Sequence, residues 1–418
     1  MPGHAPNVPR FLSVCLSLAG WLAGCGGSPR PNAGGQTESD ALRATARVEH
    51  LDTLVREPML AEHPSGALFV TGYNRRRPRL WRSTDGGATW ATVDVGGEAD
   101  GAIGNSDVDL AVARDGTLYF LTMGFDRARS EGTHVAIGVS HDVGATWRWT
   151  MLSKARFDDR PWVEVAPDGA AHVIWNDGKG VNHAVSRDRG ATWMRMARVS
   201  DRGGSSHLAV GPHGEIAVRL TPGAASGNTC DEGVDFVALS ADGGATWQRR
   251  APPGGTRPSG CLNARGQQIP RWVDPIAWDS TGALYALWTT DKGVWLGRSP
   301  DSGVTWSTWR IAQDSAAYFP YLAARGRGEV AATWLTSARD TVQWRVARLG
   351  AGAGAPPSVA LSERFPLESW VGDPPIPDAG GEYLATALLR DGSVAVVTPV
   401  QHESARRLGF TWWRFTSR

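Results

Sequence analysis

The chain has 418 residues and a formal net charge of +1 at pH 7, and charged residues make up 20% of it. A net charge this close to zero does not imply a nucleic-acid partner, and none is expected. The 51 glycines, 26 prolines and 20 tryptophans, with no long helical periodicity, indicate many short strands joined by turns.

Residues 1–25 have the features of an export signal. Arg10 precedes an apolar run, 11–23, that is too short to span a bilayer. The run leads into the tetrapeptide LAGC, whose last residue is Cys25. This ending resembles the bacterial lipobox, which implies an exported lipoprotein that carries lipid on Cys25. Cleavage by an ordinary signal peptidase, without lipid, is the alternative.

The next segment is predicted to be a tether. Residues 26–43 include a stretch rich in Gly, Ser, Pro and Asn, a composition typical of flexible linkers. The lipobox resemblance implies a protein held in the cell envelope, on the periplasmic or the surface side of a membrane, through its N-terminal lipid only. Residues 44–418 are then expected to form the folded domain.

Two cysteines remain in the folded domain. Cys230 and Cys261 lie in loop-like sequence rich in Gly, Ser and Pro. A disulfide between them suits an oxidising compartment, and two free thiols are the alternative. Neither cysteine shows metal-site spacing, and the ten histidines show none either. We therefore expect no metal and no cofactor.

An octapeptide of the form S-x-D-x-G-x-T-W is the main repeat of the chain. Its copies lie 46–59 residues apart and begin at Ser83, Ser140, Ser186, Ser240 and Ser299. A repeat of this period indicates one supersecondary unit that is used many times, as in a propeller or a solenoid.

The residue types of the octapeptide predict a structural turn. Asp accepts hydrogen bonds from backbone N–H groups one or two residues further on, and Gly adopts a positive φ without steric cost. The Trp ring buries a large area against a neighbouring element. The repeated aspartates are therefore expected to hold their own turns and to take no part in catalysis: Asp85, Asp142, Asp188, Asp242 and Asp301.

The octapeptide resembles the Asp-box, or bacterial neuraminidase repeat, of the sialidase superfamily. The resemblance extends over residues 55–415. It implies a β-propeller in which each box forms the turn between the third and fourth strands of a blade, on the face opposite the active site. The superfamily contains sialidases, other glycosidases and non-enzymatic binding proteins, so the resemblance implies a fold and does not name a reaction.

A second pattern gives the number of blades. Each unit has a short apolar strand, a turn with glycine and a second apolar strand, and seven such turns contain Gly66, Gly116, Gly169, Gly214, Gly282, Gly328 and Gly392. We predict an all-β fold, a single β-propeller of seven four-stranded antiparallel blades. Six blades, the number in sialidase catalytic domains, is the alternative. The last unit offers three strands, so residues 44–51 should supply its outer strand and cover its edge.

Candidate ligand-binding residues lie where the innermost strands begin. Arginines and carboxylates alternate there around the expected channel: Arg56, Asp109, Asp159, Arg160, Arg271 and Asp274. An arginine fork binds carboxylate groups or sugar oxygens, so these residues predict a pocket for a glycan or an anionic small ligand. Arg–Asp pairs that only line a wet channel are the alternative.

The resemblance to sialidases also implies two catalytic positions. Arg56 stands ten residues before Gly66, like the arginine of the family's Arg-Ile-Pro motif, although Glu follows it here. Tyr383 stands nine residues before Gly392, at the place of the family's catalytic tyrosine.

Two other parts of that machinery are missing from the sequence. The loop 74–79, where the family's acid/base Asp lies, contains arginines and no carboxylate, and a guanidinium group cannot donate the proton. The position of the Glu that assists the tyrosine is Ser205. Without a base, a tyrosine is a poor nucleophile at neutral pH.

These observations support three functions. We expect a monomeric, sialidase-like propeller that recognises a glycan or another anionic ligand at its channel mouth, with catalysis unproven. One alternative is an exo-acting glycoside hydrolase of the exo-alpha-sialidase type, in which Asp109 or Asp159 replaces the lost acid/base group. The other is a non-enzymatic scaffold that binds protein partners.

Overall fold

The computed structural model describes residues 42–51, 53–74, 76–222, 234–254, 273–338, 341–352, 355–367, 382–402 and 407–417. The chain divides into two compact units, Met1–Thr37 and Glu38–Arg418, and all described residues belong to the second. No helix among them is long and apolar enough to cross a membrane. The predicted signal peptide lies outside the described residues, as do Cys25, Cys230, Cys261 and Arg271.

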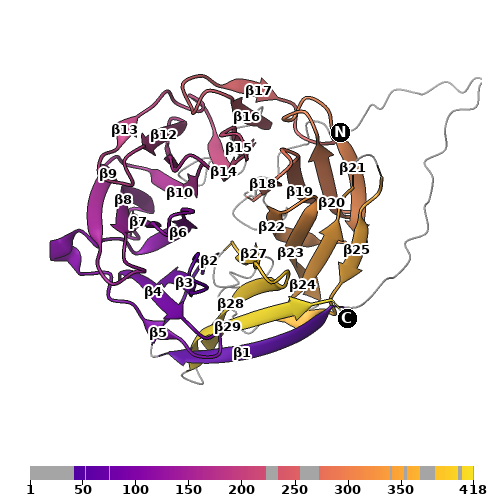
Figure 1. Cartoon of the computed structure of the whole chain (residues 1–418), viewed down its shortest axis with the longest axis horizontal. Coiled ribbons are helices and arrows are strands. Elements are labelled where there is room, and N and C mark those ends of the chain that lie inside the picture. The colour runs from indigo at the N-terminus through magenta and orange to yellow at the C-terminus, as the bar shows by residue number, and fades with distance from the viewer. Residues whose placement is uncertain are drawn as a thin grey trace, which may run out of the picture. The chain divides into compact units, whose positions relative to one another are not determined.

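The second unit consists of seven antiparallel sheets that follow one another around a ring (Figure 1). The first blade comprises β2 (Leu60–Glu62), β3 (Leu68–Tyr73), β4 (Pro78–Ser83) and β5 (Ala91–Thr92), and a short 3-10 helix, η1 (Glu98–Asp100), follows it. The second comprises β6 (Ser106–Val112), β7 (Leu118–Asp126), β8 (Glu131–Ser140) and β9 (Arg148–Ser153). The third comprises β10 (Asp158–Val165), β11 (Ala171–Asp177), β12 (Val181–Ser186) and β13 (Met194–Arg195).

The remaining blades repeat this order. The fourth comprises β14 (Gly204–Val210), β15 (Ile216–Thr221), β16 (Phe236–Ser240) and β17 (Gln248–Arg250), and the fifth β18 (Ile276–Trp278), β19 (Leu284–Thr290), β20 (Gly293–Ser299) and β21 (Ser307–Ala312). The sixth comprises β22 (Ala317–Arg325), β23 (Glu329–Ala338), β24 (Thr341–Gly350), β25 (Ser358–Leu361) and β26 (Phe365–Pro366). The seventh comprises β27 (Thr386–Leu388), β28 (Val394–His402), β29 (Arg407–Thr416) and β1 (Arg43–Leu51).

The ring confirms the prediction of an all-β, seven-bladed propeller with four-stranded antiparallel sheets. The sixth blade is a variation, because β25 and β26 pair with successive parts of β24 and share the place of a fourth strand. Every residue of the middle strands β3, β12, β15 and β16 is buried. Burial of successive residues is what a strand shows when its sheet is covered on both faces.

The seventh blade closes the ring. β1 pairs with β29 along its whole length, from Arg43 opposite Thr416 to Leu51 opposite Leu408. This confirms that the run 44–51 provides the outer strand of the last blade. In Figure 1 β1 lies outside β29, and it hydrogen-bonds to an edge that would otherwise stay open.

The repeated octapeptides form turns between the third and fourth strands of five blades. In the first copy the hydroxyl of Ser83 donates to Asp85 Oδ1 at 2.8 Å, and Gly87 N donates to Ser83 Oγ at 2.9 Å. Asp85 also accepts from Thr89, from its N–H at 2.8 Å and its hydroxyl at 2.6 Å. The carboxylate therefore accepts hydrogen bonds from the residue four positions further on, whereas the sequence led us to expect a donor one or two positions further on. The same Asp–Thr pair of bonds occurs at Asp142, Asp188, Asp242 and Asp301.

The octapeptide tryptophans join neighbouring blades. Trp90 packs edge-on against Phe410 of the seventh blade, with ring centroids 5.4 Å apart. Trp193 contacts Tyr119 of the second blade in the same geometry at 6.2 Å. In both cases the indole packs on the preceding blade, and aromatic pairs of this kind stabilise a contact beyond the area that they bury.

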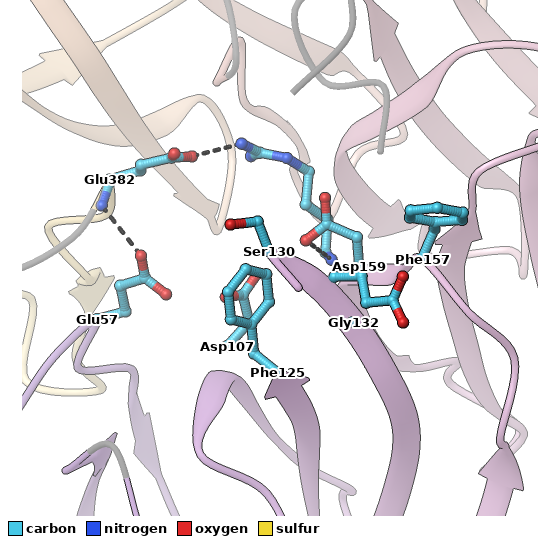
Figure 2. Close-up of a pocket in the computed structure, with 10 residues that line it drawn as sticks. Glu57, Asp107, Phe125, Ser130, Gly132, Phe157, Asp159 and Glu382 are labelled. Carbon is cyan, nitrogen blue, oxygen red and sulfur yellow. Dashed lines mark hydrogen bonds and ion pairs between the residues drawn. The ribbon is translucent and has the colours of Figure 1, made fainter. Parts of the chain in front are cut away.

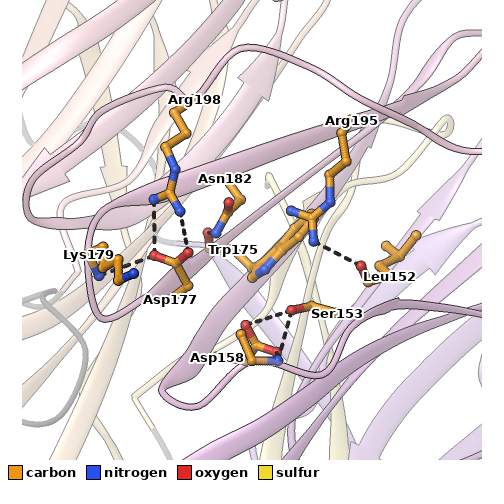
Figure 3. Close-up of polar contacts among 10 residues, drawn as sticks. Leu152, Ser153, Asp158, Trp175, Asp177, Lys179, Asn182, Arg195 and Arg198 are labelled. Atoms are coloured by element: carbon orange, nitrogen blue, oxygen red, sulfur yellow. Dashed lines mark hydrogen bonds and ion pairs between the residues drawn. The ribbon is translucent and has the colours of Figure 1, made fainter.

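Polar contacts also join the second and third blades (Figure 3). The guanidinium group of Arg195 lies 4.1 Å from the centroid of the Trp175 ring and donates to Leu152 O of the second blade at 3.0 Å. At the start of β10, the buried carboxyl group of Asp158 accepts from Ser153 Oγ of β9 at 3.0 Å. These contacts fix the start of β10, which carries the candidate site.

Candidate functional site

The inner strands begin with an irregular backbone. Register shifts interrupt the first residues of β6, β10, β14 and β22. Glu57, Arg160 and Phe319 adopt positive φ values of 44°, 48° and 46° although they are not glycine, and proline follows each of them. Bulges redirect side chains, and strained residues of this kind gather at functional sites. The starts of the inner strands are therefore the place to look for a site.

A cavity of about 110 Å³, here called the mouth cavity, lies at this end of the inner strands. Figure 2 shows Glu57 and Glu382 on one side of it, with Asp107 and Asp159 across from them. The residues come from the seventh, first, second and third blades, and from the turn between β7 and β8. The whole lining is Glu57, Asp107, Phe125, Ser130, Glu131, Gly132, Phe157, Asp159, Arg160 and Glu382.

Arg160 lies at the centre of the hydrogen-bond network of the mouth cavity. Its Nη2 donates to Glu382 Oε2 at 2.6 Å, and its Nη1 donates to the hydroxyl of Tyr383 at 2.8 Å. Only 8% of its surface is exposed. Two of the five donors of this guanidinium group therefore bind the protein's own side chains, which limits what it offers to a ligand.

Asp159 has the most unusual acid–base environment in this cavity. Burial first, and then the negative charge of Asp107, raise the pKa of its carboxyl group to about 7, and the positive charge of Arg160 opposes the shift. The carboxyl group accepts one backbone hydrogen bond, from Arg160 N at 3.0 Å. At neutral pH the group is therefore divided between its protonated and ionised forms, so it can either donate or accept a proton.

The overall charge of the mouth cavity is acidic. Arg160 is the basic residue of the lining, whereas the acidic residues of the lining are Glu57, Asp107, Glu131, Asp159 and Glu382. At the rim, Arg156 pairs with Glu131 at 2.6 Å but is itself largely exposed. Because like charges repel more strongly where water is excluded, this balance disfavours an anionic ligand and favours a neutral or cationic one.

Asp159 and Arg160 are the predicted ligand-binding residues that the structure brings together in the mouth cavity. Arg56 Nε lies 3.5 Å from the hydroxyl of Tyr73, outside the lining of this cavity. Asp274 is buried and pairs with the fully buried Arg219 at 3.2 Å. The carboxyl group of Asp274 and the guanidinium group of Arg219 are thus paired with each other in the interior of the protein.

Asp109 lies deeper along β6 than the mouth cavity. Its two carboxyl oxygens accept hydrogen bonds from Leu110 N and Val163 N, both at 2.8 Å. It lines a second cavity on the axis of the ring.

Tyr383 and Ser205, at the positions of the sialidase tyrosine and of the Glu that assists it, are both buried. Tyr383 is 5% exposed, and burial raises its pKa well above the ordinary value, although Arg160 opposes the shift. Its hydroxyl accepts the hydrogen bond from Arg160 and lies behind the mouth cavity. Ser205 is fully buried and donates to Asn176 Oδ1 at 3.0 Å. A phenol that stays protonated is a poor nucleophile.

Sequence reasoning did not select several residues of the mouth cavity. Glu57, Asp107 and Glu382 neighbour selected residues, and a bulge at the strand start decides which neighbour faces the cavity. Glu131 is the first residue of β8, and Phe157 lies in the segment between β9 and β10; neither position belongs to a repeated sequence motif. Proline after Glu57 and after Arg160 was the available signal for the irregular strand starts.

Within the part of the chain that the structure describes, no group of three or more His, Cys, Asp or Glu residues could hold a metal ion. The side chains that line the mouth cavity can supply hydrogen bonding by carboxyl groups, proton transfer at Asp159 and contact with aromatic rings.

No protein-family model matches the sequence, and no curated protein matches it either. Solved structures are similar. An alpha-L-arabinanase from Penicillium chrysogenum, complexed with arabinobiose, is 14% identical, with a TM-score of 0.43 over 77% of this chain and 97% of that one. A Hadza microbial sialidase is 18% identical, with a TM-score of 0.46 over 74% of this chain and 66% of that one. YCF48 from Cyanidioschyzon merolae is 14% identical, with a TM-score of 0.49 over 89% and 98%. At these identities the likeness is one of fold, and it assigns no chemistry to the site.

Proposed function

We propose that the protein binds the end of a glycan in the mouth cavity, with a preference for neutral or amino sugars over acidic ones. The observation that carries the proposal is the acidic lining, in which Arg160 is already paired with Glu382. The sequence led us to expect either a glycan or another anionic ligand. The acidic lining favours a glycan without negative charge, because an acidic ligand would be repelled in this cavity.

The side chains of the mouth cavity suit a sugar in two ways. Ionised carboxylates accept hydrogen bonds from hydroxyl groups, and such charge-assisted bonds are stronger than neutral ones. Phe157 is 36% exposed, and Phe125 also lines the cavity. Aromatic rings offer flat apolar surface to the C–H face of a sugar ring. A few convergent polar groups beside an aromatic wall is the usual pattern of a small-ligand site.

The test is a glycan array followed by calorimetry on purified protein. We expect neutral and amino-sugar glycans to bind, and sialylated or sulfated glycans of the same backbone to bind less. Asp159→Asn and Glu382→Gln should each weaken binding about tenfold, or about 1.4 kcal/mol. The matched control is Asp291→Asn, in the exposed turn between β19 and β20, which should change nothing. Preference for acidic glycans would contradict the proposal, and the absence of any glycan binding would favour the protein-binding scaffold.

A second candidate function, glycoside hydrolysis, is favoured by Asp159 and Glu382. Asp159 has a pKa raised to about 7, whereas Glu382 forms an ion pair with Arg160 at 2.6 Å. Two carboxyl groups in contrasting environments are what a glycosidase needs as acid and as base or nucleophile. With nitrophenyl glycosides, Asp159→Asn should lower turnover by about 100-fold or more, and Tyr383→Phe should not. If the protein hydrolysed sialosides and lost this activity in the Tyr383→Phe variant, the result would support the tyrosine-based mechanism instead.

The proposed location is the bacterial cell envelope, with lipid on Cys25 as the anchor. This rests on the sequence ending LAGC alone. Mass spectrometry of the membrane-bound protein should find the lipid on an N-terminal Cys25, and Cys25→Ser should release the protein into the soluble fraction. A monomer in detergent, expected from the closed ring, is checked by light scattering.

A further inference from the structure

A second cavity, here called the axial cavity, lies further along the inner strands and has a volume of about 280 Å³. All seven blades contribute to its lining through their inner strands or the residues next to them. On the inner strands that line both cavities, the residues of the axial cavity follow those of the mouth cavity, as Asp109 follows Asp107 on β6 and Glu164 follows Asp159 on β10. The axial cavity therefore lies towards the face that carries the octapeptide turns.

Two acidic side chains line the axial cavity without an ionic partner. Asp109 and Glu164 form no ion pair with any of the described residues. Burial raises the pKa of Asp109 to about 7 and that of Glu164 to about 8, and the charge of Asp109 adds to the shift at Glu164. A cation that enters this cavity would meet two carboxyl groups, and no basic side chain is among the described residues that line it apart from the uncharged ring of His207.

Aromatic rings stand beside these carboxyl groups. His207 packs between Trp162 and Tyr321, with ring centroids 4.7 Å and 5.5 Å away. His207 and Trp162 are 7% and 3% exposed, and His207 Nδ1 and Trp162 Nε1 have no hydrogen-bond partner among the described residues. Burial lowers the pKa of His207 to about 4, so at neutral pH the imidazole is an uncharged ring that does not repel a cation.

Apolar side chains, among them Leu110, Leu208 and Ile276, line part of the axial cavity, but most of the surface that the cavity exposes is polar. The cavity thus offers carboxyl groups and aromatic rings to a ligand. Aromatic faces attract organic cations. A metal ion does not suit this place, since no described group of three ligand residues could hold one.

We propose that the axial cavity binds a small organic cation, a protonated amine or a quaternary ammonium group, between Asp109 and Glu164 and against the rings of Trp162, His207 and Tyr321. This site is separate from the mouth cavity, and it goes beyond the proposed binding of a glycan.

The experiment compares probes of equal size and different charge on the full protein. Calorimetry measures n-butylammonium, tetramethylammonium, 1-butanol and butyrate. We expect the two cations to bind with dissociation constants below about 1 mM, and the alcohol and the anion to bind at least about tenfold more weakly. Equal binding of butyrate or butanol would overturn the proposal, and so would the absence of cation binding or displacement of the cation by Ca²⁺.

The pH dependence gives a second readout. The titratable residues that line the cavity are Asp109 on β6, Glu164 on β10, His207 on β14 and Tyr321 on β22, and the lining residues from the other inner strands do not titrate. His207 is neutral above pH 5, and burial raises the pKa of Tyr321 well above its ordinary value. Cation affinity should therefore rise about tenfold between pH 6 and pH 9, as the two carboxyl groups ionise. A fall over this range would contradict the proposal.

Two variants locate the site. Glu164→Gln removes one charge and keeps the shape, and Ala323→Leu, on the wall contributed by β22, fills the space and keeps both charges. Each should weaken cation binding about tenfold or more and leave glycan binding unchanged, with Asp291→Asn again as the control. Thermal melting establishes that each variant is folded. Cation binding that survives both changes would place the site elsewhere and refute the proposal.

Discussion

The aspartates of this chain show how surroundings decide what one residue type can do. Asp85 lies in an exposed turn, but hydrogen bonds from Thr89 first, and then from Ser83, lower its pKa to about 2. Asp159 accepts one backbone hydrogen bond, and burial raises its pKa to about 7. Donors favour the charged form and desolvation disfavours it. The octapeptide aspartates are thus fixed acceptors, whereas Asp159 can exchange a proton near neutral pH.

The raised pKa values of Asp109, Asp159 and Glu164 predict that stability falls as pH rises. Their folded-state values are about 7, 7 and 8, above the ordinary values of 3.8 and 4.5. At these three groups the folded state binds more protons than the unfolded state, and the stability that they contribute is lost as pH rises through 7 and 8. The lowered pKa values of the buried His172, His183 and His207 oppose this loss only below about pH 6.5. Calorimetry should therefore show the melting temperature falling from pH 6.5 to pH 8.5.

Glu164→Gln tests the origin of that fall. At pH 8.5 the variant should unfold with a free energy about 1 kcal/mol higher than the wild type, because it no longer carries a charge that folding partly removes from water. The gain is smaller than the full pKa shift implies, since Glu164 is partly exposed and water screens part of the cost. At pH 5 the two proteins should melt alike. A melting temperature that rises from pH 6.5 to pH 8.5 would contradict the assignment.

The octapeptide turns also make contacts between blades. The adjacent glycines Gly86 and Gly87 of the first turn allow the role in the turn and the role in the contact to be distinguished. Gly86 and Gly87 have φ values of +71° and +90°. A Cβ at Gly86 meets nothing within 4 Å, whereas a Cβ at Gly87 would lie 2.4 Å from Nε1 of Trp412 on the seventh blade. The turn requires a positive φ at both glycines. The contact with the seventh blade requires, in addition, the absence of a side chain at Gly87.

Gly86→Ala and Gly87→Ala should therefore destabilise the protein to different extents. Both pay the backbone strain of a left-handed alanine, about 1–2 kcal/mol. Gly87→Ala adds overpacking against Trp412, another 1–3 kcal/mol or so. Denaturant unfolding followed by tryptophan fluorescence gives both free energies, with Gly86→Ala as the matched control. Equal losses would mean that the indole of Trp412 moves aside freely and that the turn does not join the blades tightly.

At the scale of the molecule, the ring was predictable from the sequence and most of the site was not. A turn with glycine recurs in every blade, so the number of these turns predicted the number of sheets. The run 44–51 had no partner strand in the first unit, and the last unit lacked a fourth strand, so the pairing of the two was predictable. The site depends on bulges that shift register within a strand, as between Ser106 and Val108, which no spacing reveals. Asp274 is an acidic residue at the start of an inner strand, as a ligand-binding residue would be. Its ionic partner Arg219, however, lies on β15 of the neighbouring blade and has no counterpart in the repeat.

Ring closure itself can be tested by truncation. A protein that starts at residue 52 lacks β1, so β29 becomes an edge strand with open N–H and C=O groups. Each backbone hydrogen bond lost costs roughly 1 kcal/mol, and an open edge promotes pairing between chains. We expect a large drop in melting temperature, with dimers or aggregates in size-exclusion chromatography. The control starts at Glu38, at the boundary between the two compact units, and keeps β1. It should melt like the full chain and stay monomeric. If the shorter protein did the same, the pairing of Arg43–Leu51 with β29 would contribute nothing to the closed ring, and the propeller would have to be held together by contacts between blade faces alone.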